Sequence, residues 1–348
     1  MSHSFLEKVL AYRPAPDFSQ LLEVLARRSP ARPTLFEFFL NGPLEERLSG
    51  LKPGGVPLEA FRARAAAYRQ AGYDYVTTQA PGFDFPTGAQ HREATVSLNE
   101  GAMITDRASF ERYSWPDPEA TAAYYGRIAP LLPEGMKVMV CGPCGVLENS
   151  IRLVGYDALC FLLADDPALA KEIFDAVGSR LRRYYEIAAA QECVGLCISN
   201  DDWGFKTQPM LPPATLREYV FPWHKRIAAA VHAAGKPVVL HSCGNAAEIW
   251  PDIIDDIQFD GKHSYEDAIE PVEAAYERHG RRIAILGGMD LDFVVRSTPE
   301  AVHRRARAML ERSAAQGGYA LGTGNSVPEY VPQENYAAMV WAALEARA

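Results

Sequence analysis

The feature that most constrains the fold is an alternation along most of the chain. Short β-branched or aromatic runs are each followed by a longer segment whose apolar residues recur at a helical period. Such runs predict buried strands, and the segments between them predict helices. Eight runs are predicted as strands: Thr34–Phe39, Tyr73–Thr78, Lys137–Cys141, Val194–Ser199, Pro237–His241, Gln258–Lys262, Arg282–Leu286 and Gly318–Leu321.

Proline and glycine positions support the same pattern. Prolines lie near helix starts, where a missing N–H costs little, and glycines follow helix ends, where a left-handed cap is common. The predicted helices are Pro213–Ala234, Ala246–Asp255, Pro271–His279, Pro299–Gln316 and Pro332–Arg347. Residues 80–116 mix Gly, Pro and polar residues, which predicts an extended insertion after the second strand.

Eight strands, each followed by a helix, predict an α/β protein built on a (β/α)8 TIM barrel. We expect a single domain over residues 1–348, with an N-terminal helical extension. An open doubly wound sheet is the alternative. The barrel is favoured because the strand count reaches eight and no phosphate-binding glycine fingerprint is present.

The charge and the apolar pattern narrow the partners. A formal net charge of −9 argues against nucleic acid, since phosphate binding needs a basic surface. The N-terminus lacks the basic and apolar regions of a signal peptide, and no run approaches the ~20 apolar residues of a membrane span. A cytoplasmic protein without a membrane partner is expected. Its six cysteines are then free thiols or metal ligands rather than disulfides.

Polar and metal-capable side chains follow nearly every predicted strand. Because the loops after barrel strands converge on one mouth, we expect these residues to share a site for a small-molecule substrate. They are Glu37, Gln79, Cys141, Cys144, Asp201, Asp202, His241, Cys243, His263, Asp290 and Asn325.

His241 and Cys243 form the sharpest of these motifs. Two residues apart on a strand-to-loop turn, an imidazole and a thiolate can reach one ion, and zinc accepts both. The alternative is a buried histidine bonded to a carbonyl, with a small apolar cysteine beside it.

Asp201 and Asp202 are the second motif. Two adjacent carboxylates facing a partly dry mouth repel each other, so one can keep a raised pKa and act as general acid or base, hold a substrate or bind metal. A helix N-cap followed by a solvent-facing acid is the alternative.

The remaining candidates are weaker. Cys141-x-x-Cys144 has the spacing of a redox or zinc pair, although the chain is not a small redox fold and coincidence is the main alternative. Asp290 is expected either to place a catalytic carboxylate in the mouth or to cap the next helix. Predicted substrate-binding residues are Glu37, Gln79, His263 and Asn325, of which the last two are also candidate metal ligands.

Four segments together resemble the uroporphyrinogen decarboxylase superfamily. They are NDDWGFKTQPMLPPATLREYVFPWHKRI, VVLHSCGNAAEIWPDII, ILGGMD and GGYALGTGNSVPEYVPQEN, and their order and spacing match over roughly residues 195–345. The resemblance implies a (β/α)8 barrel. That superfamily contains a decarboxylase of the heme pathway and zinc-dependent methyltransferases that work with corrinoid proteins or coenzyme M.

The two branches imply different residues. The decarboxylase grips an acidic tetrapyrrole with arginines from an N-terminal loop, which this sequence lacks at the matching place near Arg32. The methyltransferases hold zinc with a His-x-Cys after the fifth strand and a cysteine after the eighth. This chain keeps His241 and Cys243 but has Asn325 at the third position.

The resemblance therefore implies a zinc-dependent enzyme that moves a methyl group between a small molecule and a corrinoid protein, a thiol or a pterin. A third ligand from Asp201, Asp202, His263, Asn325 or Cys141 is expected. Metal-independent decarboxylation of a porphyrinogen-like or other carboxylated substrate, with Asp201 or Asp202 stabilising positive charge, is the alternative. Relatives form homodimers, so the resemblance allows a homodimer here.

Overall fold

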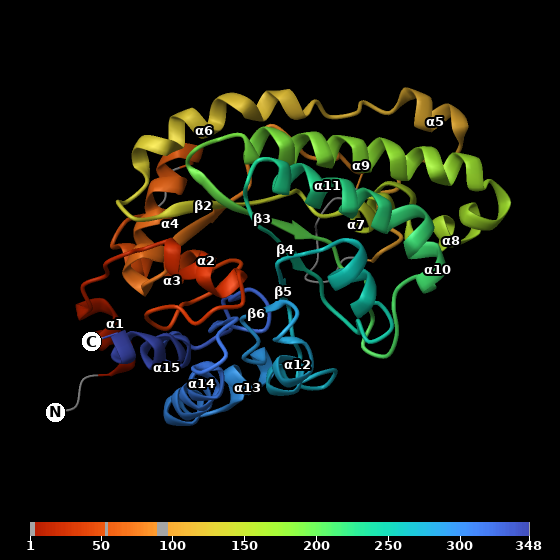
Figure 1. The fold of residues 1–348 in the computed structure, drawn as a ribbon. Coiled ribbons are helices and arrows are strands. Elements are labelled where there is room, and N and C mark those ends of the chain that lie inside the picture. The colour runs from red at the N-terminus through yellow and green to blue at the C-terminus, as the bar shows by residue number, and fades with distance from the viewer. Residues whose placement is uncertain (1–3, 53–54, 89–96, 348) are drawn as a thin grey trace.

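A computed structural model describes residues 4–52, 55–88 and 97–347. Its centre is one parallel sheet of seven strands in the order β1-β2-β3-β4-β5-β6-β7 (Figure 1). The strands are β1 (Tyr75–Thr78), β2 (Lys137–Cys141), β3 (Val194–Asn200), β4 (Val238–His241), β5 (Gly261–His263), β6 (Ala284–Leu286) and β7 (Tyr319–Ala320). Seven of the eight predicted strands are therefore confirmed, and the fold is α/β and TIM-barrel-like.

The first predicted strand, Thr34–Phe39, is the exception. It meets the segment after β7 through one parallel bridge between Leu35 and Leu321 and forms no strand of the sheet. On its other side, the Tyr75 hydroxyl of β1 accepts the backbone N–H of Glu37 at 2.6 Å and donates to the Glu37 carbonyl at 2.7 Å. A side chain thus takes the backbone groups that a ladder between this segment and β1 would use. The apolar composition of Thr34–Phe39 correctly predicts that the segment is buried, but it does not predict that a side chain takes its backbone hydrogen bonds.

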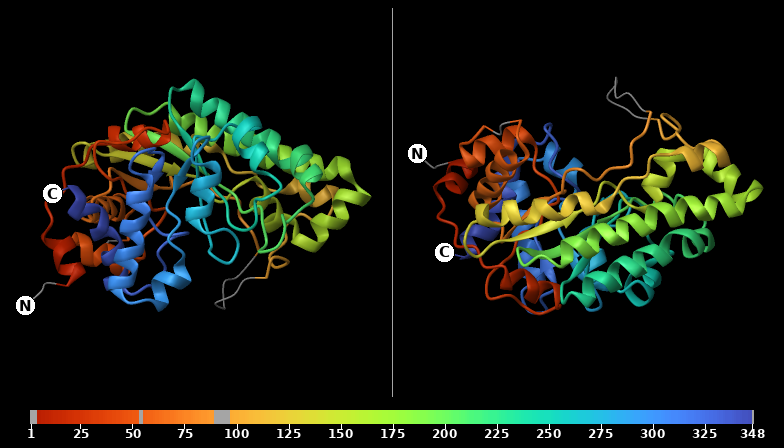
Figure 2. Two further views of the ribbon diagram at one scale, coloured as in Figure 1. Left: turned by 60° about the horizontal axis from the view of Figure 1, so that its bottom comes forward. Right: turned by 90° about the horizontal axis from the view of Figure 1, so that it is seen from above.

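Helices surround the sheet, and the views agree that α9 and α11 lie side by side along the outside of β3 (Figures 1 and 2). The α-helices of eight or more residues are α3 (Gly42–Ser49), α4 (Pro57–Ala71), α7 (Val146–Val154), α8 (Tyr156–Asp165), α9 (Pro167–Ala189), α11 (Phe221–Ala233), α12 (Val272–His279), α14 (Pro299–Ser313) and α15 (Gln333–Leu344). The shorter α-helices are α1 (Phe5–Ala11), α2 (Ser19–Leu25), α5 (Arg107–Arg112), α6 (Ala122–Ile128), α10 (Pro213–Thr215) and α13 (Leu291–Arg296). Short 3-10 turns are η1 (Pro118–Thr121), η2 (Ala129–Leu131) and η5 (Glu345–Arg347).

The five predicted helices are found with two differences. The segment Pro213–Ala234 contains a π-helical turn, η3 (Leu216–Val220), between α10 and α11. Pro222 follows this turn, and its missing N–H removes an i→i−4 bond, which accounts for the wider turn. In the segment Ala246–Asp255, residues 246–249 form a turn, and the helical part begins at Trp250 and continues as a second π-helical turn, η4 (Asp252–Asp256).

Helices α1 to α4 precede β1, and α1 packs on α15, so both ends of the chain lie on one side of the molecule (Figure 1). The Phe5 N–H donates to the Glu334 carboxylate at 2.5 Å. In the predicted insertion, 80–116, the described residues form one short helix, α5, and part of the segment lies outside the described residues. Helices long and apolar enough to cross a bilayer are absent from the described part of the chain.

Candidate metal centre

Three neighbouring strands, β3, β4 and β5, end at the same level of the sheet. The pairing register places Asn200 beside His241 and His241 beside His263. The residues that follow these strands therefore meet at one edge, where the mouth of a barrel lies.

Asp202, His241 and Cys243 come together at this edge. One ligand atom from each, a carboxylate oxygen, an imidazole nitrogen and a sulfur, lies within 4.8 Å of the other two. The Cys243 Sγ is 3.7 Å from His241 Nε2, and the Cys243 backbone N–H donates to the Asp202 carboxylate at 2.8 Å. His241 is buried, whereas the other two are partly exposed, so the cluster is open on one side.

Two glycines bring the loops of this cluster together. Gly244 has a left-handed backbone, φ +85°, and a Cβ there would lie 2.0 Å from the Gly204 carbonyl oxygen. A Cβ on Gly204 would in turn lie 2.5 Å from the Asn245 nitrogen. Only glycine fits at both positions, since backbone packs on backbone. This contact fixes the loop of Asp202 against the loop of Cys243.

The Cys243 sulfur accepts hydrogen bonds from two sides. The Ser264 hydroxyl donates at 3.5 Å and the Asn325 side-chain amide at 3.3 Å. The orientation of that amide is fixed because its oxygen accepts the Ser326 N–H at 2.8 Å. Burial, and then the negative charge of Asp202, raise the pKa of the Cys243 thiol well above its ordinary value. The free thiol is therefore protonated at neutral pH, and the two donors would favour its thiolate.

A second histidine, His263, contacts His241 on the side away from Cys243. His241 Nδ1 is 2.8 Å from His263 Nδ1, and His263 Nε2 is 3.1 Å from the Thr323 carbonyl oxygen. The Thr323 hydroxyl and N–H both donate to the fully buried Glu37 carboxyl. Burial lowers the pKa of His263 to about 3 and raises that of Glu37 to about 8, so both groups are neutral at pH 7.

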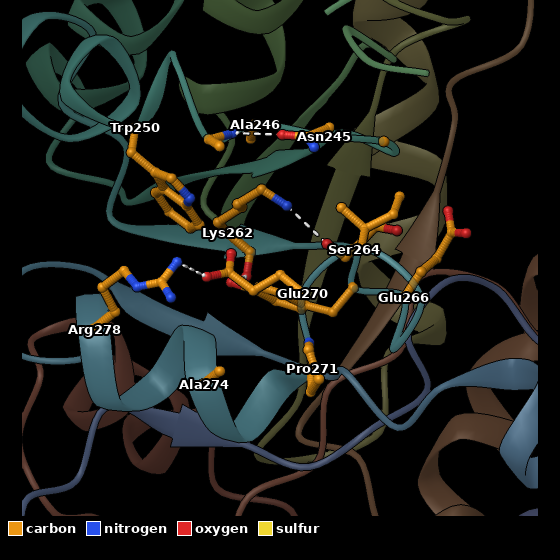
Figure 3. Close-up of a pocket in the computed structure, with 14 residues that line it drawn as sticks. Asn245, Ala246, Trp250, Lys262, Ser264, Glu266, Glu270, Pro271, Ala274 and Arg278 are labelled. Carbon is orange, nitrogen blue, oxygen red and sulfur yellow. Dashed lines mark hydrogen bonds and ion pairs between the residues drawn. The ribbon is translucent and has the colours of Figure 1, made fainter. Parts of the chain in front are cut away.

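A pocket lies between the segment that follows β4 and the segment that follows β5 (Figure 3). Its volume is about 170 Å³, and its lining includes Ser264, Trp250 and Lys262, but none of the three clustered residues. The buried Lys262 ammonium donates to the Ser264 carbonyl at 2.7 Å and to the Ser242 carbonyl at 3.3 Å. It thereby ties together the ends of β4 and β5. Burial lowers the pKa of Lys262 to about 8.

Asp201 lies away from the cluster. Its carboxylate is fully buried and accepts four hydrogen bonds, from the Leu147 and Glu148 backbone N–H groups, the Trp203 indole and His224 Nε2. Two of these donors belong to the first turn of α7. The hydrogen bonds of this carboxylate thus go to structural partners, and the two predicted acids lie in different environments.

The acid that does face Asp202 is Glu148, which the sequence analysis did not select. Burial, and then the negative charges of Asp202 and Asp201, raise the pKa of Glu148 to about 8. Burial also raises the pKa of Asp202. A glutamate three residues after Gly145 has the spacing of a capping box, which gives it an ordinary structural explanation and hides it from sequence reasoning.

Other predicted site residues lie outside the cluster. Asp290 caps α13 by accepting the Phe293 N–H at 2.8 Å. Gln79 is exposed and lines a separate depression beside Trp115. Cys141 is buried with its thiol against the Thr78 carbonyl, and Cys144 faces Arg152.

Comparison with known proteins bears on this arrangement. The family model described as "Uroporphyrinogen decarboxylase (URO-D)" matches residues 92–346. The chain is 23% identical over 257 residues to the uroporphyrinogen decarboxylase of Methylococcus capsulatus, which covers 70% of each chain. It is 30% identical over 130 residues to that of Anaeromyxobacter sp., covering 37% of this chain and 36% of the relative. A methyltransferase from Methanosarcina mazei has the same fold, with a TM-score of 0.71, 18% identity and coverage of 95% and 98%.

Proposed function

Since the chain belongs to the uroporphyrinogen decarboxylase family, we propose that it is a zinc-dependent methyltransferase of that family. The observation that carries the proposal is the cluster of Asp202, His241 and Cys243, whose ligand atoms lie within 4.8 Å of one another. The likeness in fold to a protein described as a methyltransferase supports it.

The donor set fits zinc. Zn–S and Zn–N bonds of about 2.3 and 2.1 Å at a tetrahedral angle place the two ligand atoms about 3.6 Å apart. The sulfur of Cys243 and Nε2 of His241 are 3.7 Å apart. Three protein ligands and a partly exposed rim are typical of catalytic rather than structural zinc sites, which keep one position open.

When bound, the metal would supply Lewis-acid activation of a thiol or of a methylated small molecule at the open position. The chain's own groups prepare that position. Ser264 and Asn325 donate to the Cys243 sulfur and favour its thiolate form. Asp202 accepts the Cys243 N–H and holds the loop in place.

The substrate would be a small molecule, and the methyl group would pass to or from a corrinoid protein, a thiol or a pterin. The pocket beside Lys262 has room for about one aromatic ring, since a cavity of roughly 150 Å³ holds benzene. The pterin or thiol end of a longer molecule would enter from the open side of the cluster.

Decarboxylation of an acidic tetrapyrrole fits less well. Such a substrate needs several free cations at the site. The lining of the pocket includes Lys262, which is held by two backbone carbonyls, and Arg278, which is paired with Glu270. Uroporphyrinogen is nonetheless included as a substrate in the test below, because two relatives are named as uroporphyrinogen decarboxylases.

The test is elemental analysis of purified protein together with two assays. We expect about one zinc per chain, demethylation of a methylated thiol or ether only when a corrinoid or thiol acceptor is added, and no turnover of uroporphyrinogen. Absence of zinc with intact activity, or turnover of uroporphyrinogen, would overturn the proposal.

A further inference from the structure

The carbonyl of Thr323 determines which nitrogen donates and which accepts in the hydrogen bond between the buried His241 and His263. A carbonyl oxygen only accepts, so His263 Nε2, 3.1 Å away, carries a hydrogen. In a neutral imidazole the other nitrogen is then bare. His263 Nδ1 therefore accepts, and its partner at 2.8 Å, His241 Nδ1, donates.

The same rule determines whether Nε2 of His241, the nitrogen nearer Cys243, carries a hydrogen. With its hydrogen on Nδ1, neutral His241 has a bare Nε2, and this is the atom that lies 3.7 Å from the Cys243 sulfur. The opposite order would need a doubly protonated His263. That ring is fully buried beside the Phe36 ring, and no carboxylate among the described residues forms an ion pair with it.

We propose that His263 is a positioning residue that selects the Nδ1–H tautomer of His241 and so presents the Nε2 lone pair to a metal. This deepens the proposed function. A metal-binding histidine commonly donates its second N–H to a carboxylate or carbonyl, and loss of such a partner costs 10- to 100-fold in metal affinity. Here the partner is a second imidazole, held in turn by the Thr323 carbonyl of the loop that carries Asn325.

The consequence is a link between the loop after β7, which carries Thr323 and Asn325, and the cluster. The Glu37 carboxyl accepts from both the N–H and the hydroxyl of Thr323, which holds the carbonyl that aligns His263. The side chains in this chain of hydrogen bonds, His241, His263, Thr323 and Glu37, are all buried, so water does not replace a missing partner.

Three variants separate positioning from packing. His263→Asn places an amide oxygen near the former Nδ1 and keeps the acceptor for His241. His263→Gln places its amide near Nε2 and keeps the contact with Thr323 only, whereas His263→Phe keeps neither. We expect a zinc dissociation constant within about threefold of wild type for His263→Asn, and 10- to 100-fold weaker for the other two, by chelator competition.

A second measurement needs no metal. Nitrogen-15 NMR of the imidazoles in the metal-free wild type should show His241 as the Nδ1–H tautomer, and His263→Asn should preserve that signal. An Nε2–H signal for His241, or equal zinc affinity in His263→Gln and wild type, would overturn the inference. Wild type that binds no zinc would refute the proposed function instead, and the tautomer signal would still decide the role of His263.

Discussion

Two neighbouring sites in this molecule use the same kinds of side chain for different ends. In the first, Asp201 bonds to His224, whose other nitrogen is 3.0 Å from the Ser199 hydroxyl, and all three are buried. In the second, Asp202 lies with His241 and Cys243 at a partly exposed edge. The first has the residue types of a Ser-His-Asp catalytic triad, but Ser199 is buried, so a substrate could not reach it.

The two sites differ in how far their polar groups are hydrogen-bonded by the protein itself. Asp201 accepts four hydrogen bonds from structural partners, whereas the sulfur of Cys243 and the Nε2 of His241 face each other at 3.7 Å with room for a ligand. Fully satisfied buried networks rigidify a fold, and incompletely satisfied ones at an open edge are where ligands bind. The predictions below test this division.

The largest effect is expected in the satisfied site. Asp201→Ala orphans two backbone N–H groups, an indole and an imidazole, so the free energy of unfolding should fall by about 3–5 kcal/mol in urea titrations. Asp202→Ala should change it by less than about 1 kcal/mol but weaken zinc binding. Equal destabilisation by the two variants would erase the distinction between the sites.

Cys243→Ala tests the open site. We expect zinc affinity to fall about 100-fold or more, or roughly 2.7 kcal/mol, in chelator competition, with the unfolding midpoint of the metal-free protein little changed. Cys160→Ala is the matched control, because that cysteine is exposed and lies outside the cluster. A zinc content that survives Cys243→Ala would place the metal elsewhere.

A third buried carboxyl, Glu37, lies between these extremes, since its donors come from Thr323 and the adjacent Phe38 N–H. Its pKa is raised by burial to about 8, above the unfolded value of 4.5, so folding retains a proton that the unfolded chain releases. Its contribution is fully present below pH 4.5 and is lost as the pH rises toward 8. From pH 5.5 to 7 this group alone should cost the wild type about 2 kcal/mol, and Glu37→Gln should remove that part of the pH dependence in urea titrations.

The smallest effect is expected at Asn325, where related methyltransferases are expected to carry a third sulfur. Asn325→Cys should tighten zinc about tenfold, or roughly 1.4 kcal/mol, because the replaced amide is 3.3 Å from the Cys243 sulfur and zinc favours thiolate. Asn325→Ala, which removes the donor without adding a ligand, should weaken zinc slightly. Tightening by both variants would mean that the amide only obstructs the site.

Local patterns sufficed for most of the fold. The strand predicted over Pro237–His241 is β4 within one residue, because an apolar run of this length has few other solutions. The strand over Thr34–Phe39 could not be assigned in this way. Its pairing is decided by the Tyr75 hydroxyl, which is remote in sequence and leaves no periodic signal.

The candidate site was predictable in part. His241 and Cys243 stand two residues apart and so fall on one side of an extended segment, as the motif implies. Asp201 and Asp202 are adjacent, and successive side chains of a strand point to opposite sides, so only one could have faced the cluster. Which one does so depends on the first turn of α7, and that packing is tertiary.

The contact between Gly204 and Gly244 sets a rule for anyone redesigning this protein. Because the two backbones touch, neither loop tolerates a longer side chain or an inserted residue at that point without separating Asp202 from Cys243. New specificity should therefore be introduced in the lining of the neighbouring pocket, for example at Glu266, Ile269 or Ala274, while the contact between the two glycines is left unchanged.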